Sequence, residues 1–300
     1  MSTFPTKILL ATDGSQDAAL AGRAAIDLSN RSGAQLHVAH AWQHLRPGTI
    51  PAIAMDEYSR AHEQWKQEAG EFLEEQAQRL RSAGGTVTGA HLREGRPAEE
   101  ISELAEELNV GLVVIGSRGL GPVKRLVTGS VSEGVVHLAP CPTLVVRGGE
   151  GAWPPSRVVV GDDASEEARR AGELAARIGK LFDARALLVR VYPSVTVFKA
   201  RRISQVRAPE ELLKKGERSL EKRAAELESI LGTRPEVRVA SGDAAAVIQE
   251  AAEGGGQPTL VAVGRRGLGA VRHFALGSVS SDILRAVSGP VLIVPSSPGG

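Results

Sequence analysis

The sequence predicts an α/β protein built from two tandem, open, parallel, five-stranded α/β sandwich domains. Its 300 residues are enough for about two domains. The two halves repeat one another, and within each half short apolar runs alternate with amphipathic helical segments. Apolar residues make up 42% of the chain and charged residues 24%, which is ordinary for a protein that folds around a core.

The repeat is visible in four segments that recur in the same order after about 150 residues. The pairs are 7–15 with 157–165, 115–121 with 263–269, 128–132 with 276–280, and 139–146 with 288–294. This period is too long for a solenoid, so whole domains are repeated. We therefore expect domains at 1–148 and 155–300, joined by a glycine- and proline-containing linker at 149–154.

The elements of the first half follow from periodicity. Residues 7–12 form a continuous apolar run, which indicates a buried strand, and Ser15 is placed to cap a helix over 15–30. Helical spacing of apolar side chains supports two more helices at 57–82 and 98–109. The remaining expected elements are a helix at 130–138 and strands at 35–41, 86–92, 111–115 and 143–147.

The second half repeats this order. Strands are expected near 157–161, 185–191, 235–240, 259–263 and 290–294, and helices near 166–181, 209–231, 243–253 and 278–287. Apolar strands separated by helices indicate a parallel sheet covered on both faces. Right-handed crossovers then favour an open, doubly wound arrangement.

Composition narrows the classes of function. No run of 18 apolar residues predicts a membrane span, and the N-terminus lacks the pattern of a signal peptide. A single cysteine, Cys141, fits a reducing compartment, so we expect a cytoplasmic protein. A net charge of +1 and an aromatic content of 3% favour neither nucleic acid nor a membrane as a partner.

Candidate binding residues follow the first and fourth strands of each half, where ligands bind in open α/β sheets. An acidic turn after the first strand carries Asp13 in one half and Asp163 in the other. A glycine loop after the fourth strand has the pattern G-x2-G-x9-G-S. Its residues are Gly116, Gly119, Gly129 and Ser130, and by repeat Gly264, Gly267, Gly277 and Ser278.

The loop has the chemistry of a phosphate site. Glycine permits positive φ angles and close approach of a ligand to the backbone, and the loop ends where a helix with unpaired N–H groups begins. The surrounding cations are Arg118, Lys124, Arg125, Arg265, Arg266 and Arg272. A carboxylate on the acidic turn could accept from ribose hydroxyls or bind a metal-bound water. Two structural alternatives stay open: the glycines could mark turns, and the aspartate could cap its helix or form an Asx-turn.

The chain resembles the universal stress proteins of the tandem type. The resemblance rests on four motifs: Leu10-Ala11-Thr12-Asp13-Gly14-Ser15, Gly95-Arg96-Pro97-Ala98-Glu99-Glu100-Ile101, the glycine loop, and Ala139-Pro140-Cys141-Pro142-Thr143-Leu144-Val145-Val146. It implies the nucleotide-binding, Rossmann-like fold of the adenine nucleotide alpha hydrolases. It also implies one ATP, or another adenine nucleotide, per half, with Mg²⁺ on the phosphates.

The resemblance also implies a role for each residue. The loop glycines and serines would hold phosphates, Asp13 and Asp163 would face ribose, and the backbone near Val38 and Val189 would contact adenine. The two halves would form an intramolecular pseudo-dimer through their last strands, with a homodimer of chains possible. The second half departs from the motifs at Asp162, at Ala164 and in lacking a partner for Pro97, so we expect its site to be the weaker.

Three functional hypotheses follow. The first is a nucleotide-dependent stress-response regulator, because no catalytic apparatus accompanies the loops. The alternative is a slow ATPase or autophosphorylating enzyme using Ser130, Ser278, Asp13 or Asp163. The third is a scaffold in which the nucleotide only fills space.

Overall fold

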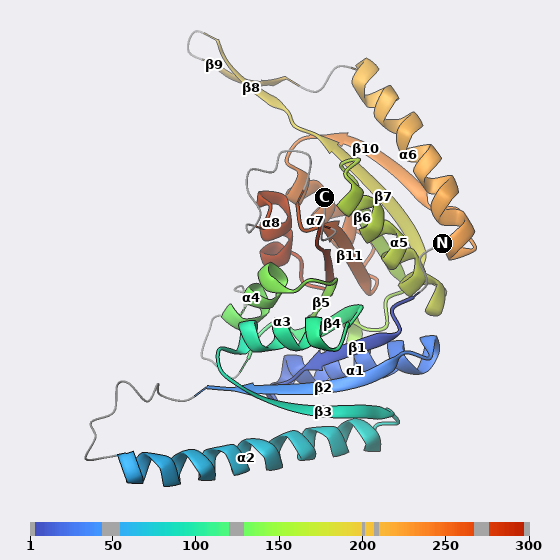
Figure 1. Cartoon of the computed structure of the whole chain (residues 1–300). Coiled ribbons are helices and arrows are strands. Elements are labelled where there is room, and N and C mark those ends of the chain that lie inside the picture. The colour runs from blue at the N-terminus through green and yellow to red at the C-terminus, as the bar shows by residue number, and fades with distance from the viewer. Residues whose placement is uncertain are drawn as a thin grey trace. The chain divides into compact units, whose positions relative to one another are not determined.

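A computed structural model describes residues 4–43, 55–119, 129–199, 202–206, 210–266 and 276–296 (Figure 1). The chain divides into two compact units. Among the described residues, unit 1 runs to Gly119 and includes Gly129–Cys141, and unit 2 begins at Pro142. No helix in this part of the chain is long and apolar enough to cross a bilayer.

Unit 1 alternates strands and helices as predicted. Its elements are β1 (Lys7–Ala11), α1 (Gln16–Ser32), β2 (Gln35–Trp42), α2 (Met55–Ser82), β3 (Val87–Glu94), α3 (Pro97–Glu107), β4 (Leu112–Gly116) and α4 (Ser130–Leu138). The four strands pair in parallel in the order β4-β1-β2-β3. Helices α1 and α2 pack together, as do α3 and α4, and Figure 1 shows α2 and α3 on opposite sides of β2 and β3.

Unit 2 repeats the pattern with additions. Its elements are β5 (Thr143–Val146), a 3₁₀ turn (Glu150–Ala152), β6 (Arg157–Gly161), α5 (Glu166–Leu181), β7 (Arg185–Tyr192), β8 (Val195–Lys199), β9 (Arg202–Val206), α6 (Glu210–Leu231), β10 (Glu236–Ser241), α7 (Ala244–Glu253), β11 (Thr259–Gly264), α8 (Ser278–Ala286) and β12 (Val291–Val294). The main sheet has the order β10-β7-β6-β11-β12-β5. Its pairs are parallel except β12 with β5, which is antiparallel.

Each half of the sequence therefore supplies five strands to a mostly parallel sheet, as the sequence predicted. The core consists of the strands' apolar runs, such as Ile8, Leu9 and Leu10 in β1 and Val158 and Val159 in β6, all at most 1% exposed. These strands are buried on both faces, which explains why they lack the alternation of a half-exposed strand.

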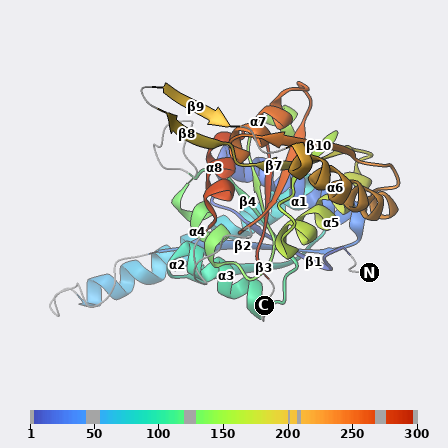
Figure 2. The ribbon, with the colours of Figure 1, turned by 90° about the horizontal axis from the view of Figure 1, so that it is seen from above.

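A hairpin was missing from the prediction. Strands β8 and β9 pair antiparallel in a separate two-stranded sheet between β7 and α6, visible as a separate ribbon in Figure 2. Each run is only five residues long, and Ala200-Arg201 between them is not one of the glycine- or asparagine-containing turns that mark a hairpin.

The segment expected as a linker is partly packed. Trp153 is 9% exposed, and its ring lies edge-on to that of Phe182, with centroids 5.2 Å apart. Arg147, the residue directly after β5, is also 9% exposed. Its guanidinium donates to the carbonyls of Val287 and Leu284 at the carboxyl end of α8, where a cation complements the helix dipole.

Candidate functional site

The topology places a binding site in each unit. After β1 the chain continues through β2 and β3 on one side and then crosses back to β4 on the other, so β1 and β4 flank the point where strand order reverses. In unit 2 the corresponding strands are β6 and β11. Ligands of open α/β sheets bind at the carboxyl ends of these two strands. The acidic turn and the glycine loop begin at those two ends.

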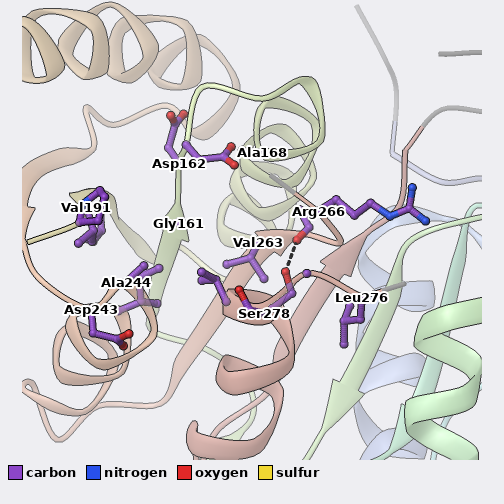
Figure 3. A pocket seen from close by; sticks show the side chains of 18 of the residues that line it. Gly161, Asp162, Ala168, Val191, Asp243, Ala244, Val263, Arg266, Leu276 and Ser278 are labelled. Atoms are coloured by element: carbon purple, nitrogen blue, oxygen red, sulfur yellow. Dashed lines mark hydrogen bonds between the residues drawn. The ribbon is translucent and has the colours of Figure 1, made fainter. Parts of the chain in front are cut away.

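Unit 2 has a cavity of about 580 Å³ at this edge (Figure 3). This volume lies within the range of about 300–1,000 Å³ typical of small-molecule sites. The cavity is lined by Asp163, Val189, Gly264, Gly277 and Ser278, all predicted site residues. Gly267, Lys124, Arg125 and Arg272 lie outside the described residues.

The cavity is lined by both apolar and polar groups. Val189 and Val191 of β7, Ile248 of α7 and Val263 of β11 supply apolar side chains. The polar lining includes Asp163 and, at the start of α8, Gly277 and Ser278. Such a cavity suits a ligand that combines a flat apolar ring with an anionic group.

The helices at the glycine loops lack side-chain caps. Gly277 is the N-cap residue of α8 and Gly129 that of α4, and neither helix has a side-chain cap hydrogen bond. By contrast, Ser15, Ser165 and Asp243 each accept from a backbone N–H and cap α1, α5 and α7. The first N–H groups of α4 and α8 are therefore available to an anion, which the helix dipole also favours.

The loop glycines serve close packing rather than positive φ angles. None of Gly116, Gly119, Gly129, Gly264 and Gly277 has a positive φ, which corrects one reason we gave for them. A Cβ on Gly116 would lie 2.6 Å from the Ala18 backbone nitrogen. A Cβ on Gly264 would lie 2.7 Å from the Glu167 Cβ. These two glycines let β4 and β11 reach the start of α1 and α5.

Two serines that sequence reasoning passed over fix the loops in place. The Ser132 hydroxyl donates to the Gly116 carbonyl at 2.6 Å, and the Ser280 hydroxyl donates to the Gly264 carbonyl at 2.7 Å. Both serines are at most 4% exposed. They tie the first turn of α4 or α8 to the end of the strand that precedes the loop. The signal was present, because both repeats contain Gly-Ser-Val-Ser.

Unit 1 has a much smaller cavity of about 100 Å³ at the equivalent edge. It is lined by Asp13, Gly116 and Gly119 among the predicted residues, while Gly129, Ser130 and Val38 are not part of its lining. Pro97 and Ile115 occupy positions where unit 2 has the smaller Ala244 and Val263. The expected ranking of the two sites is thus not matched by their volumes.

The strand pairing also revises one equivalence. Asp162 donates its N–H to the Val189 carbonyl, and Thr12 donates to the Ala39 carbonyl, so Val189 corresponds to Ala39 and not to Val38. Val38 is 0% exposed. Because successive side chains of a strand point to opposite faces, Val38 faces the other way from Ala39 and Ala41. The mismatch arose because a shift of one residue aligns Val38 with Val189 and Leu36 with Leu187, whereas the observed register aligns no identical residues of β2 and β7.

Both aspartates of the acidic turns stabilise the turn itself. Asp13 Oδ1 accepts from the Ser15 N–H at 3.0 Å, and Asp163 Oδ1 accepts from the Ser165 N–H at 2.9 Å. This is the Asx-turn alternative. Asp13 is half-buried and Asp163 is exposed.

Asp162 does not add an unbalanced negative charge to the unit 2 site. It is 6% exposed, pairs with Arg190 and lies 3.8 Å from the Arg223 guanidinium. In Figure 3 its carboxylate points away from Ser278. The electrostatic reason for expecting a weak second site is therefore wrong. Arg265 in the nearby loop is affected differently: burial, and then the charge of Arg266, lower the pKa of its guanidinium.

The described residues contain no group of three or more His, Cys, Asp or Glu side chains that could hold a metal ion. Cys141 is buried, and burial raises the pKa of its thiol to about 12, so it is not a thiolate ligand at neutral pH.

The comparisons with known proteins agree with this geometry. The universal stress protein family profile matches residues 5–147 and 155–295. A universal stress protein of Thermus aquaticus is 38% identical over 145 residues, covering 47% of this chain and 97% of that protein. YxiE of Bacillus subtilis, also a universal stress protein, is 33% identical over 149 residues, covering 47% and 98%.

Among solved structures, a universal stress protein from Archaeoglobus fulgidus aligns with a TM-score of 0.66 at 24% identity, over 98% of this chain and 97% of that one. This likeness supports the fold, while the family profile covers nearly the whole sequence in two successive matches. The chain belongs to the universal stress protein family, with two such domains in tandem.

Proposed function

We propose that the protein is a cytoplasmic, adenine-nucleotide-binding regulator of the stress response, with its principal site in unit 2. The observation that carries the proposal is the uncapped start of α8 in the lining of a cavity of about 580 Å³. An uncapped helix start supplies unpaired N–H donors, and the apolar lining supplies a surface for a purine.

Each part of the ligand has a counterpart in the cavity. The backbone N–H groups at the start of α8 and the Ser278 hydroxyl would donate to phosphate oxygens. The Asp163 carboxylate would accept from a ribose hydroxyl. Val189, Val191 and Ile248 would contact the base. Mg²⁺ would bind through the phosphates, since the described residues offer no metal-binding cluster of their own.

Occupancy would act as a signal by favouring one surface for a partner. The enzymatic alternative makes a distinct prediction. It requires ADP release from bound ATP in a single turnover, lost when Asp163 is changed to Asn. The regulatory role requires binding without that release.

The test should avoid the glycines, because Gly116 and Gly264 variants would disturb the fold through backbone contacts. Val191→Phe instead fills the unit 2 cavity, and Ala41→Phe is its matched control in unit 1, where Ala41 lines the smaller cavity. Calorimetric titration of the nucleotide-stripped chain with Mg-ATP should show that Val191→Phe weakens the tighter binding event at least about tenfold.

Ala41→Phe should leave that event unchanged. The proposal fails if the stripped wild-type chain does not bind Mg-ATP. It also fails if Ala41→Phe, rather than Val191→Phe, removes the tighter event. Circular dichroism of both variants checks that the sheet and helices are retained.

A further inference from the structure

Resting on the proposed function, we propose that Arg147 is a positioning residue for phosphate binding in unit 2. The described residues that line the unit 2 cavity do not include Arg147. It would act through α8, because it binds the carboxyl end of this helix while the N–H groups at the other end donate to the phosphates.

Arg147 contacts the end of α8 through both terminal nitrogens of its guanidinium. Nη1 donates to the Val287 carbonyl at 3.2 Å, and Nη2 donates to the Leu284 carbonyl. Val287 and Leu284 are at most 2% exposed. Removing a charged donor from a buried carbonyl is unfavourable, so the guanidinium anchors this end of the helix.

The start of α8 lies at the cavity. Residues 277–280 all line it, and the helix has no side-chain cap hydrogen bond. The Ser280 hydroxyl donates to the Gly264 carbonyl at 2.7 Å, which ties this end of the helix to β11. Nine residues at a rise of about 1.5 Å each make α8 only about 13 Å long, so an anchor at one end affects where the N–H groups at the other end point.

Arg147 would favour an anion at the start of α8 in two ways. Its hydrogen bonds fix the axis of the helix, so the N–H groups need less ordering when phosphates bind. Its charge offsets the negative partial charge of the last carbonyls, which would otherwise oppose an anion on the same helix. Adenosine has no phosphate and should gain nothing from either effect.

The repeat contains no second copy of this arginine. Arg147 directly follows β5, and the aligned position after β12 is Pro295, whose side chain has no donor. Residues 143–145 of β5 pair with β12. A residue from the first repeat would therefore support the ligand site of the second, and the glycine motif of unit 2 does not reveal it.

The coupling must run in both directions. If the guanidinium contacts strengthen phosphate binding, bound phosphate strengthens the guanidinium contacts by the same free energy. Mg-ATP, but not adenosine, should therefore slow amide hydrogen exchange in β5, directly before Arg147.

The experiment uses the full-length chain with Ala41→Phe, so that titration reports unit 2. Arg147→Met in this background removes the charge and both hydrogen bonds. We expect it to weaken Mg-ATP binding at least about fivefold, and adenosine binding, measured by displacement of ATP, less than about twofold. The ratio of the two affinities is the readout, because a general loss of cavity structure would weaken both ligands alike.

Arg157→Met is the matched control. Arg157 Nη1 donates to the Ala251 carbonyl at 2.8 Å near the end of α7, whose first residue also lines the cavity. The Asp243 side chain caps that helix by accepting from the Ala246 N–H. Loss of Arg157 should therefore leave the ratio of ATP to adenosine affinity unchanged.

Equal weakening of both ligands by Arg147→Met, or weakening of neither, would overturn the role of Arg147. The same change of ratio in Arg157→Met would also overturn it. Absence of Mg-ATP binding in the Ala41→Phe chain would instead remove the proposed function. If Arg147→Met melts markedly below its parent, Arg147→Lys keeps the charge without the fork, and it should weaken ATP alone by a smaller factor; an unchanged ratio in that variant would equally refute the proposal.

Discussion

Units 1 and 2 share strand order, acidic turn and glycine loop, yet they hold the acidic turn by different chemistry. In unit 1 the His40 ring lies 2.9 Å from the Thr12 carbonyl and packs on Phe72. In unit 2 the corresponding residues include Asp162 and Arg190, which form a buried ion pair. The same backbone turn can thus be stabilised by a histidine that contacts a carbonyl and an aromatic ring or by a buried ion pair, and a motif alone does not tell which.

The turn glycine illustrates how one difference permits another. Gly14 has φ +75, and a Cβ there would lie 2.9 Å from the Phe72 ring. In unit 2, Ala164 occupies this position with φ +70. Leu80 lies against Gly22 in unit 1, and Leu227 lies against Gly172 in unit 2, so these contacts align α2 with α6. In this alignment the smaller Ser219 takes the place of Phe72. Ala164 therefore has room for its side chain, although its backbone stays in the left-handed region.

The largest difference should come from removing the buried cation. Arg190→Met leaves the Asp162 carboxylate without its main partner and should lower the free energy of unfolding of unit 2 by about 4 kcal/mol. His40→Met, its counterpart in unit 1, loses one hydrogen bond and should cost about 1 kcal/mol. Hydrogen exchange read by mass spectrometry at increasing urea concentration separates the two units.

A double variant sharpens this comparison. Asp162→Thr with Arg190→His installs the unit 1 pair in unit 2 and should recover more than half of the loss. If Arg190→Met costs no more than His40→Met, buried charge is not what stabilises the unit 2 turn.

The next largest effect should come from the glycines that pack on backbone. Gly116→Ala places a Cβ 2.6 Å from backbone atoms of α1 and should destabilise unit 1 by about 3 kcal/mol. Gly264→Ala meets the Glu167 Cβ at 2.7 Å and its nearest backbone atom at 2.9 Å, against 2.6 Å for Gly116→Ala, so its cost should be smaller. Urea unfolding of both variants measures the order, and a Gly264→Ala cost above that of Gly116→Ala would contradict it.

Lowering the pH should reduce the stability of unit 1 towards unfolding more than that of unit 2. His37 Nδ1 lies 3.0 Å from His91 Nε2, and burial is the main cause that lowers the pKa of each ring from the ordinary 6.5. Lys7 and Arg93 add to this for His37 and His91 respectively, while Glu107 opposes it for His91. Unit 2 has Leu187 and Arg238 at these positions.

Below pH 6.5 the unfolded chain binds protons that the folded histidines do not. Stability of unit 1 is therefore complete above this pH and falls as the pH drops towards the lowered pKa values. Urea midpoints between about pH 7.5 and pH 5.5 should decline more for unit 1 than for unit 2. His91→Gln should flatten that decline, and an unchanged slope would refute the role of the pair.

The smallest expected change is a gain. Ala164→Gly relieves a left-handed backbone and should stabilise unit 2 by up to about 1 kcal/mol. Gly14→Ala should do the opposite in unit 1, because the new side chain meets Phe72. Thermal melts of the two variants that shift in the same direction would show that the two turns are not equivalent.

The sequence was sufficient where local pattern decides the structure. Buried strands, helix positions, the repeat and the two loops at the reversal of strand order followed from periodicity and from Gly and Asp after apolar runs. It was insufficient where side chains distant in sequence decide. Arg190 and Arg223 neutralise Asp162 from other elements, and Pro97 and Ile115 accompany a smaller cavity in unit 1. Neither effect leaves a mark within the glycine motif.

Strand β5 has a practical consequence for dividing the gene. It precedes the repeat boundary in sequence, yet it belongs to unit 2, where it pairs with β12, and the Arg147 guanidinium after it donates to the carbonyls of Val287 and Leu284 at the end of α8. A fragment that starts at residue 155 would expose the Val291, Leu292 and Ile293 backbone of β12 as a new edge, which invites aggregation. A second half that keeps the pairing of β12 should begin before Pro142, so the repeated segment and the compact unit of this chain differ by one strand.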